Sequence, residues 1–271
     1  NSYDVVKLMF ERAVCRINNK LIYPDQRDGE LRDKKQLCER YQEWTFVDGE
    51  GKEQGFIHAW LCDKNKRQYR RMDFFPEDCP DDCYNTFSDY DVKNIDKKMG
   101  EQGVIQPFLD LTDALCDGET KYVLDYCALL YQKPGTKPRT ALVFKGREGD
   151  GKNHWSNTHK ALMGKKLYCE TNNSSQDVYG TNATAYNSKK LVVMNESEAK
   201  LNFQNCGRLK SLITDVDGVK INPKYVNHYD IRNLAGTIIF TNEKVPVVIG
   251  KNDRRFVPFT TNSKYNNNQA F

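Results

Sequence analysis

The feature that most constrains this chain is a glycine-containing loop between a strand-like run and a helix-like run. The loop is Gly146-Arg147-Glu148-Gly149-Asp150-Gly151-Lys152-Asn153. It follows the apolar run 140–144, and residues 155–163 after it carry apolar side chains at helical spacing. A strand, a glycine loop ending in Gly-Lys and a helix form the layout of a phosphate-binding P-loop. The alternative is a glycine-rich turn with a surface lysine, and the rest of the chain decides between the two.

The residue types in this loop suit a phosphate group. Glycines allow a tight curl in which backbone N–H groups point inward at phosphate oxygens. The helix that follows presents free N–H groups and the positive end of its dipole to the same anion. We therefore expect a nucleotide to contact a set of residues from this stretch, with the lysine reaching the β- and γ-phosphates: Gly146, Glu148, Gly149, Asp150, Gly151, Lys152, Asn153 and His154.

Composition excludes some classes of protein. The 271 residues suffice for one large domain or two smaller ones, and 38% hydrophobic with 29% charged residues is typical of a globular chain. The net charge of +4 permits a nucleic-acid partner but does not argue for one. No run approaches the roughly 18 apolar residues of a membrane span. Nine scattered cysteines favour a reducing, intracellular compartment over a disulfide framework.

The order of the apolar patterns predicts an α/β fold with additions before it. Residues 1–90 mix helix-like and strand-like segments, which predicts a small mixed α/β region. Residues 91–138 are helix-rich and end in a proline turn, which predicts a small helical unit. Strand-like and helix-like runs follow from 139 to 262, predicting a central, largely parallel sheet. Residues 263–271 are rich in asparagine and are expected to form a loose tail.

Polar residues at the ends of the apolar runs, or just beyond one, match the needs of phosphoryl transfer. That reaction requires a metal near the phosphates, a group that orients water, a sensor of the γ-phosphate and a positive charge for the transition state. Lys152 can serve the phosphates, Glu196 the attacking water and Asn242 the γ-phosphate. Arg254 or Arg255 can supply the positive charge. The alternative is that Glu196 and Asn242 cap turns and the arginines form surface ion pairs.

An ordered set of motifs then covers roughly residues 60–260. It comprises an upstream segment at 60–87, a helix and proline turn at 125–138, the loop at 146–153, a strand with polar end at 191–196, a hairpin segment at 209–224, a strand ending in Thr-Asn at 237–242 and an arginine segment at 255–257. This set resembles the superfamily 3 helicases. More narrowly, it is similar to the helicase domain of poxvirus-type, large-DNA-virus and phage primase-helicases.

The resemblance implies an AAA+-like P-loop NTPase that binds ATP and Mg²⁺ between the subunits of a homohexameric ring and translocates on single-stranded DNA. Lys152, Glu196 and Asn242 would act from one subunit and Arg255 from the next. A set of hairpin residues would contact the DNA strand by charge and stacking: Lys220, Lys224 and Tyr225. Because the chain begins at Asn1 without a methionine, we expect a fragment of a longer protein. The resemblance implies a primase or nuclease domain upstream, with a primase domain the expected one. The expected location is a viral replication site in a host cell or a phage-infected cytoplasm.

Two residues depart from the pattern of this family. Asn153 stands where a hydroxyl usually binds Mg²⁺, and Asn195 stands where the first acid of the Walker B strand usually lies. The implied metal residues are therefore Asn153, Asn195 and Glu196. An amide oxygen can bind Mg²⁺ but carries no charge. This leaves open a ring that binds nucleotide and grips or loads DNA with weak hydrolysis. Another P-loop ATPase, such as a packaging motor, is a further alternative, which the order of hairpin, sensor and arginine disfavours.

Overall fold

The structure is a computed structural model that describes residues 1–94, 105–196, 198–223, 227–243, 247 and 252–266. The chain divides into two units, which are described separately. Unit 1 comprises Asn1–Asp73, Asp78–Asn85 and Asn222–Tyr229, and unit 2 comprises Phe74–Glu77, Thr86–Ile221 and Asp230–Phe271. The helices expected at 91–138 and the sheet expected at 139–262 thus lie in one unit. No described helix is long and apolar enough to cross a membrane.

A five-stranded parallel sheet forms the centre of unit 2. Its strands are β9 (Ala141–Lys145), β10 (Tyr168–Thr171), β11 (Leu191–Met194), β14 (Gly236–Thr241) and β15 (Phe256–Thr260). They lie in the order β10-β11-β14-β9-β15, and each neighbouring pair is parallel. The mixed α/β fold with a parallel sheet confirms this part of the prediction. Because the strands are parallel, the segments that follow β9, β11 and β14 leave the sheet at the same edge.

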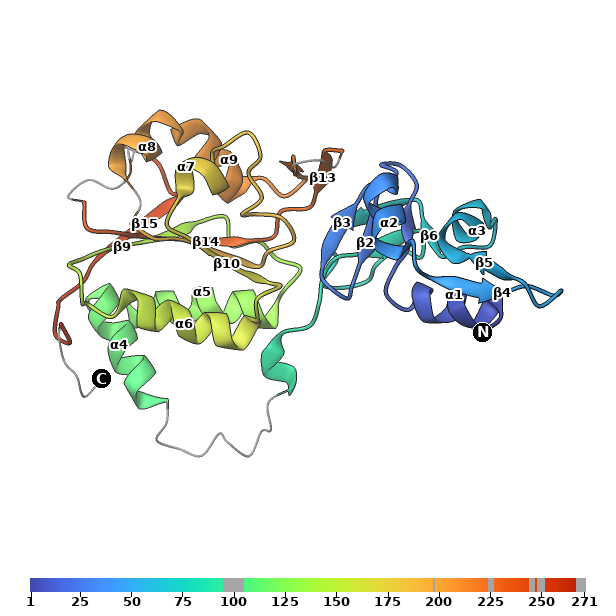
Figure 1. The fold of residues 1–271 in the computed structure, drawn as a ribbon. Helices are drawn as coiled ribbons and strands as arrows, with labels where there is room; N and C mark the ends of the chain where they lie inside the picture. Colours follow the sequence, from blue (N-terminus) through green and yellow to red (C-terminus); the bar gives the residue numbers. More distant parts are fainter. Residues whose placement is uncertain (95–104, 197, 224–226, 244–246, 248–251, 267–271) are drawn as a thin grey trace. The chain divides into compact units, whose positions relative to one another are not determined.

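Helices cover both faces of this sheet (Figure 1). One face carries α4 (Gln106–Cys116), α5 (Thr120–Gln132) and α6 (Lys152–Met163), and the other carries α7 (Ser174–Asp177), α8 (Ala199–Gln204) and α9 (Cys206–Thr214). Every residue of β11 and β14 is buried, and so are the first four of β9. Burial on both faces explains why these strands are continuous apolar runs in the sequence.

Buried hydrogen bonds attach the helices of unit 2 to the sheet and to each other. The Tyr126 hydroxyl of α5 donates to the carbonyls of Thr140 and Thr237 and accepts from the Thr237 N–H at 2.9 Å. The indole of Trp155 on α6 donates to the Thr112 hydroxyl of α4 at 3.0 Å. These contacts fix α4 and α5 against the two elements that carry the glycine loop, β9 and α6.

The described residues of unit 1 form three short helices and four two-stranded pairs. The helices are α1 (Tyr3–Glu11), α2 (Lys34–Tyr41) and α3 (Phe56–Cys62). The antiparallel pairs are β2 (Tyr23–Asp25) with β3 (Glu30–Arg32) and β4 (Thr45–Val47) with β5 (Glu53–Gly55); the parallel pairs are β1 (Arg16–Ile17) with β6 (Gln68–Tyr69) and β7 (Arg71–Asp73) with β8 (Cys83–Asn85). The core centres on Phe10, whose ring lies 4.9 Å from Trp60 and 5.0 Å from Tyr41. Near the unit boundaries lie η1 (Asp91–Asn94) and the pair β12 (Val219–Ile221) and β13 (Tyr229–Ile231).

The structure differs from the sequence prediction at several element boundaries. The apolar spacing of residues 31–44 predicts a helix over that range, but α2 begins only at Lys34, because Asp33 and Gln36 form a reciprocal capping box that fixes the helix start there. The spacing of residues 203–213 predicts one helical segment, but this part of the chain contains two helices that meet at Asn205. The Asn205 side chain donates to the Leu201 carbonyl at 2.9 Å, a local bond that competes with helix continuation.

Candidate nucleotide-binding site

Three segments meet in a cavity of about 250 Å³ at the carboxyl edge of the sheet. The first is the glycine loop after β9 together with the start of α6, the second is Asn195 and Glu196 after β11, and the third is the end of β14 with Asn242. They meet because β14 lies between β9 and β11 in the sheet. The structure therefore brings together Lys152, Asn195, Glu196 and Asn242.

Lys152 lies at the centre of this arrangement. Its ammonium donates to the carbonyl oxygens of Arg147 at 2.7 Å and Gly146 at 3.1 Å, and to the side-chain oxygen of Asn242 at 3.4 Å. Only 9% of the residue is exposed. Burial lowers the pKa of Lys152 below its usual value, although the carboxylates of Asp150 and Glu148 act in the opposite direction. One side chain thus connects the loop to the end of β14.

The glycines are required by the shape of the loop. Gly149 and Gly151 have φ values of 85° and 87°, in the left-handed region that side-chain-bearing residues rarely adopt. A Cβ at Gly151 would also lie 2.7 Å from a Leu111 methyl group of α4. At Gly146 the constraint is space, because a Cβ there would lie 1.9 Å from the Thr261 hydroxyl oxygen.

The Asp150 carboxylate holds the loop in this shape. It accepts hydrogen bonds from the backbone N–H of Arg147 at 2.7 Å, from the hydroxyl of Thr261 and from the Asn266 amide at 2.9 Å. Burial alone would raise the pKa of Asp150, but these hydrogen bonds together lower it. Asn266 also donates to the Glu148 carbonyl at 2.7 Å. Part of the segment expected to be a loose tail therefore packs on the loop, while residues 267–271 lie outside the described residues.

The start of α6 supplies further donors to the cavity. The helix begins at Lys152, and among the described residues no side chain caps its first turn. The first N–H groups of a helix have no partner within it, so here they can serve an anion. Asn153 and His154 are exposed at this end and line the cavity.

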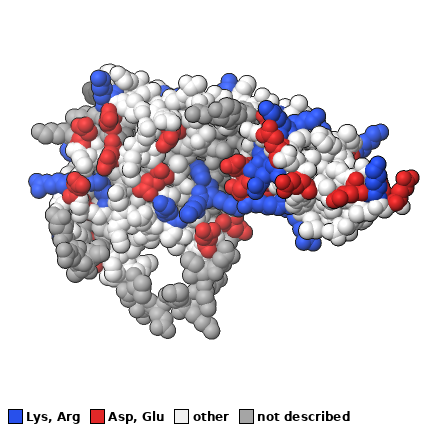
Figure 2. Space-filling view, in the orientation of Figure 1, with Lys and Arg blue, Asp and Glu red and all other residues white. Residues whose placement is uncertain are grey.

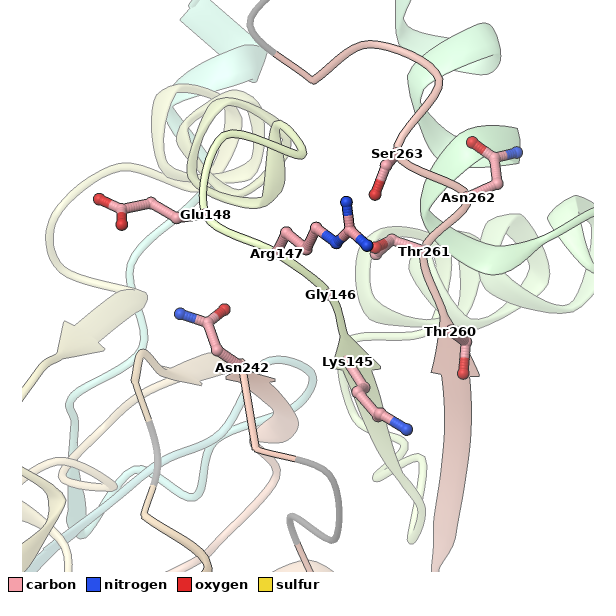
Figure 3. A pocket seen from close by; sticks show the side chains of 9 residues that line it. All are labelled: Lys145, Gly146, Arg147, Glu148, Asn242, Thr260, Thr261, Asn262 and Ser263. Carbon is pink, nitrogen blue, oxygen red and sulfur yellow. The ribbon is translucent and has the colours of Figure 1, made fainter.

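A second cavity, of about 650 Å³, lies on the other side of the loop between the ends of β9 and β15. Figure 3 shows its nine lining residues, with the Arg147 guanidinium extending toward Thr261 and Ser263. Glu148 and Asn242 line both cavities. The two spaces therefore adjoin at the glycine loop, and the larger one is walled by polar side chains and backbone.

The residues proposed for the metal differ in their surroundings. Asn195 is 7% exposed, and its amide nitrogen donates to Glu170 at 2.6 Å, while its buried side-chain oxygen has no hydrogen-bond partner in the described part of the chain. Glu196 has a φ of 48° and an exposed side chain. No cluster of three or more His, Cys, Asp or Glu able to hold a metal is found among the residues that the structure describes. An unpartnered amide oxygen beside one carboxylate fits a hard cation such as Mg²⁺, which takes few protein oxygens and completes its shell with phosphate and water.

The two arginines lie away from the cavity. Arg255 directly precedes β15 and its carbonyl accepts from the N–H of Ala141, the first residue of β9. It is therefore at the amino edge of the sheet, separated from the glycine loop by a strand of five residues at about 3.3 Å each. Its guanidinium pairs with Asp253 at 3.3 Å, and Arg254 is exposed. Within one chain neither arginine is brought to Lys152.

The residues expected to bind DNA are only partly described. Lys220 is exposed on β12, whereas Lys224 and Tyr225 lie outside the described residues. Figure 2 shows Lys and Arg side chains interspersed with Asp and Glu within each unit on the face in view.

Sequence reasoning missed three residues of the site. Glu170 lies on β10, a strand that we did not predict, and contacts Asn195. Thr261 and Asn266 reach the loop from the segment after β15. Tyr168-Cys169-Glu170-Thr171 is too short and too mixed to indicate a strand, and no local pattern links residue 261 to residue 150.

The chain is a mixed α/β protein with a five-stranded parallel sheet, an arrangement consistent with a nucleotide-binding-like fold. Residues 144–255 match DUF5906, a family of unknown function. The chain is also 33% identical over 138 residues to the DNA primase-polymerase of Nitratiruptor phage NrS-1, which shows homology to that phage protein. The match covers 49% of this chain and 18% of the relative, so the chain spans a minor part of the relative's length.

Solved structures of the NrS-1 C-terminal region, in apo form, have the same fold. Two of them align with 98% of this chain, over 63% of their own length. Both have a TM-score of 0.75, and their sequence identities are 20% and 21%. A third covers 96% of this chain and 60% of its own, with a TM-score of 0.69 and 21% identity. At this level of identity the likeness shows the fold alone.

Proposed function

We propose that this chain is the ATP-hydrolysing helicase part of a phage-type DNA replication protein, with an AAA+-like P-loop core of superfamily 3. The observation that carries the proposal is the convergence of Lys152, Asn195, Glu196 and Asn242 on one cavity at the start of α6. Phosphate chemistry requires these groups together, whereas separate turn caps would have no reason to share a cavity.

The chain's own residues divide the work as follows. The glycine loop and the first turn of α6 bind the phosphates, and Lys152 turns from the loop carbonyls toward the β- and γ-oxygens. Asn242 already contacts Lys152, so it lies close enough to sense the γ-phosphate. The exposed Glu196 carboxylate orients the attacking water. Asn153, Asn195 and Glu196 would hold Mg²⁺, which neutralises charge on the phosphates when bound.

Arg255 acts in this proposal from a neighbouring subunit. It lies at the edge of the sheet opposite to its own glycine loop, so it can serve only another copy's nucleotide. Head-to-tail contacts of this kind close into rings, and the resemblance favours a homohexamer. Arg254 is the alternative source of the positive charge.

Single-stranded DNA is the proposed substrate of the ring, contacted through Lys220, Lys224 and Tyr225. The phage relative is a DNA primase-polymerase by name, which supports a role in DNA replication. It also supports a priming domain upstream of this segment in the full-length protein. The proposed place of action is a reducing compartment where phage or viral DNA is replicated, and all nine cysteines are free in the structure.

A second candidate is a ring that binds nucleotide and grips or loads DNA with little hydrolysis. The observation that favours it is the pair of amides at the metal position, since neither Asn153 nor Asn195 brings a negative charge. The two candidates predict the same nucleotide binding and differ only in turnover.

Steady-state ATP hydrolysis with single-stranded DNA tests the proposal. Lys152→Ala is expected to lower turnover by roughly 10²–10³-fold, the range for removal of one group that stabilises transition-state charge. Lys166→Ala, which removes an exposed lysine just after α6, should hydrolyse like wild type. If wild type is no faster than Lys152→Ala, the enzyme interpretation is wrong. Nucleotide binding that still depends on Lys152 would then favour the gripping ring.

A further inference from the structure

Glu170 occupies a position that the proposed function does not use. It lies on β10, the edge strand beside β11, and its carboxylate accepts from the amide nitrogen of Asn195 at 2.6 Å. We propose that Glu170 is a positioning residue that turns the Asn195 side-chain oxygen toward the cation and supplies the negative charge that Asn195 lacks. This inference rests on the proposed function, because it concerns how the nucleotide's metal is held.

The chemistry of the pair fixes the orientation of the amide. An ionised carboxylate only accepts hydrogen bonds, so Asn195 must present its N–H₂ group to Glu170. The side-chain oxygen then has to face away from Glu170, and it is the buried oxygen without a partner. Asn195 lines the cavity that also holds Lys152 and Glu196, so in the proposed arrangement this oxygen serves a cation beside the phosphates.

Other contacts fix the Glu170 carboxylate in turn. It accepts from the Tyr168 hydroxyl at 3.1 Å and from the Ser156 hydroxyl at 3.4 Å, and it lies 3.9 Å from the ammonium of Lys160. Ser156 and Lys160 belong to α6, the helix that begins at the glycine loop. The side chain of Glu170 is 18% exposed. The pair thus connects the phosphate-binding helix to the strand that ends at the metal position.

The same geometry explains why position 195 carries an amide. An aspartate there would place two carboxylates at hydrogen-bond distance, and like charges this close disfavour joint ionisation. With asparagine at 195 and glutamate at 170, the negative charge lies one strand away and the residue that lines the cavity is neutral. Removing a residue that orients a metal ligand without touching the metal typically weakens metal affinity by about 10–100-fold.

Binding of Mn²⁺ in the presence of ADP, measured by electron paramagnetic resonance, tests the inference without turnover. The glutamine in Glu170→Gln can hydrogen-bond to the Asn195 amide in either orientation, and it carries no charge. We therefore expect about 10–100-fold weaker Mn²⁺ binding. ADP binding in the presence of a chelator should stay as in wild type. The exchange Glu170→Gln with Asn195→Asp reverses donor and acceptor and should return Mn²⁺ affinity to within a few-fold of wild type.

Two further variants separate orientation from general charge and from folding. Glu198→Gln removes an exposed carboxylate near the site and should bind Mn²⁺ as wild type does. Asn195→Asp alone should melt at a lower temperature than the exchange variant at pH 7, because its two carboxylates face each other.

Several outcomes would overturn the inference. These are unchanged Mn²⁺ binding by Glu170→Gln, an equal loss in Glu198→Gln, or a folded exchange variant that fails to recover affinity. Wild type that binds ADP but no Mn²⁺ would overturn it while leaving nucleotide binding intact. Wild type that binds no ADP at all would instead refute the proposed function on which it rests.

Discussion

At the scale of single residues, the site depends on how closely the loop is packed. Gly146 has no room for a Cβ, because Thr261 and Asp150 occupy that space with their mutual hydrogen bond. The same bond holds the carboxylate that accepts from the N–H of Arg147. Loop shape is therefore decided by a contact between residues that are 111 positions apart.

Gly146→Ala should break this contact. We expect a loss of about 1–3 kcal/mol in the free energy of unfolding, the usual cost of overpacking, together with weaker nucleotide binding. Chemical denaturation and ADP titration measure the two effects. Gly207→Ala on α9 is the matched control, because a Cβ there meets nothing within 4 Å; it should leave nucleotide binding unchanged and should not lower the free energy of unfolding. Full nucleotide affinity in Gly146→Ala would contradict the role given to the Asp150–Thr261 contact.

At the scale of elements, α6 is both the proposed phosphate-binding helix and a core helix. Its His159 is 2% exposed, meets the Trp155 ring edge-on with ring centres 4.4 Å apart and is hydrogen-bonded to the Tyr131 hydroxyl at 2.9 Å. Burial lowers the pKa of His159 from 6.5 to about 4. The packing of α6 against α5 is therefore made with a neutral imidazole.

This burial predicts a dependence of stability on pH. Between pH 6.5 and about 4 the unfolded chain binds a proton at His159 that the folded chain does not, so stability falls as the pH is lowered through this range. The loss from this one group is about 3 kcal/mol when complete. Denaturant midpoints at pH 7 and pH 5 should differ less in His159→Gln than in wild type. His58→Gln, at an exposed histidine of unit 1, should keep the wild-type difference.

At the scale of the whole molecule, the position of Arg255 leaves the proposed hydrolytic site incomplete in one chain. The arginine lies at the amino edge of the sheet, and the glycine loop lies at the carboxyl edge. A hydrolysing site of the proposed kind therefore needs two copies of the chain. Sedimentation with ATP and single-stranded DNA should show an oligomer, and a strict monomer would count against the role of Arg255.

Mixing two inactive variants tests the division of the site between subunits. Arg255→Ala should lower ATP hydrolysis by roughly 10³–10⁵-fold while nucleotide still binds. Mixed in equal amounts with Lys152→Ala, it should regain activity, since about a quarter of the interfaces in a random ring then join two intact groups. Arg254→Ala, treated in the same way, identifies which arginine acts. If rings shown to contain both variants recover no activity, the division of the site between two subunits is wrong.

The sequence predicted those parts of the fold that depend on local patterns. The apolar run 191–194 is strand β11, and the run 236–240 lies within β14, because strands buried on both faces are continuous apolar segments. Strand β10 was missed since Cys169 and Glu170 are only partly buried and interrupt its apolar pattern. The helix break at Asn205 was missed because it depends on a side-chain hydrogen bond to Leu201, which does not alter the spacing of the apolar residues.

By itself the sequence determined the glycine loop, the polar residues at the strand ends and the α/β alternation, because each can be recognised from residues that are adjacent in the sequence. Only the tertiary structure decided that β14 lies between β9 and β11, which brings Asn242 to Lys152. It alone placed Glu170 beside Asn195 and Arg255 at the opposite edge. The physical reason is that strand order depends on hydrogen bonding and burial between segments far apart in the sequence. A pattern of neighbouring residues does not contain that information.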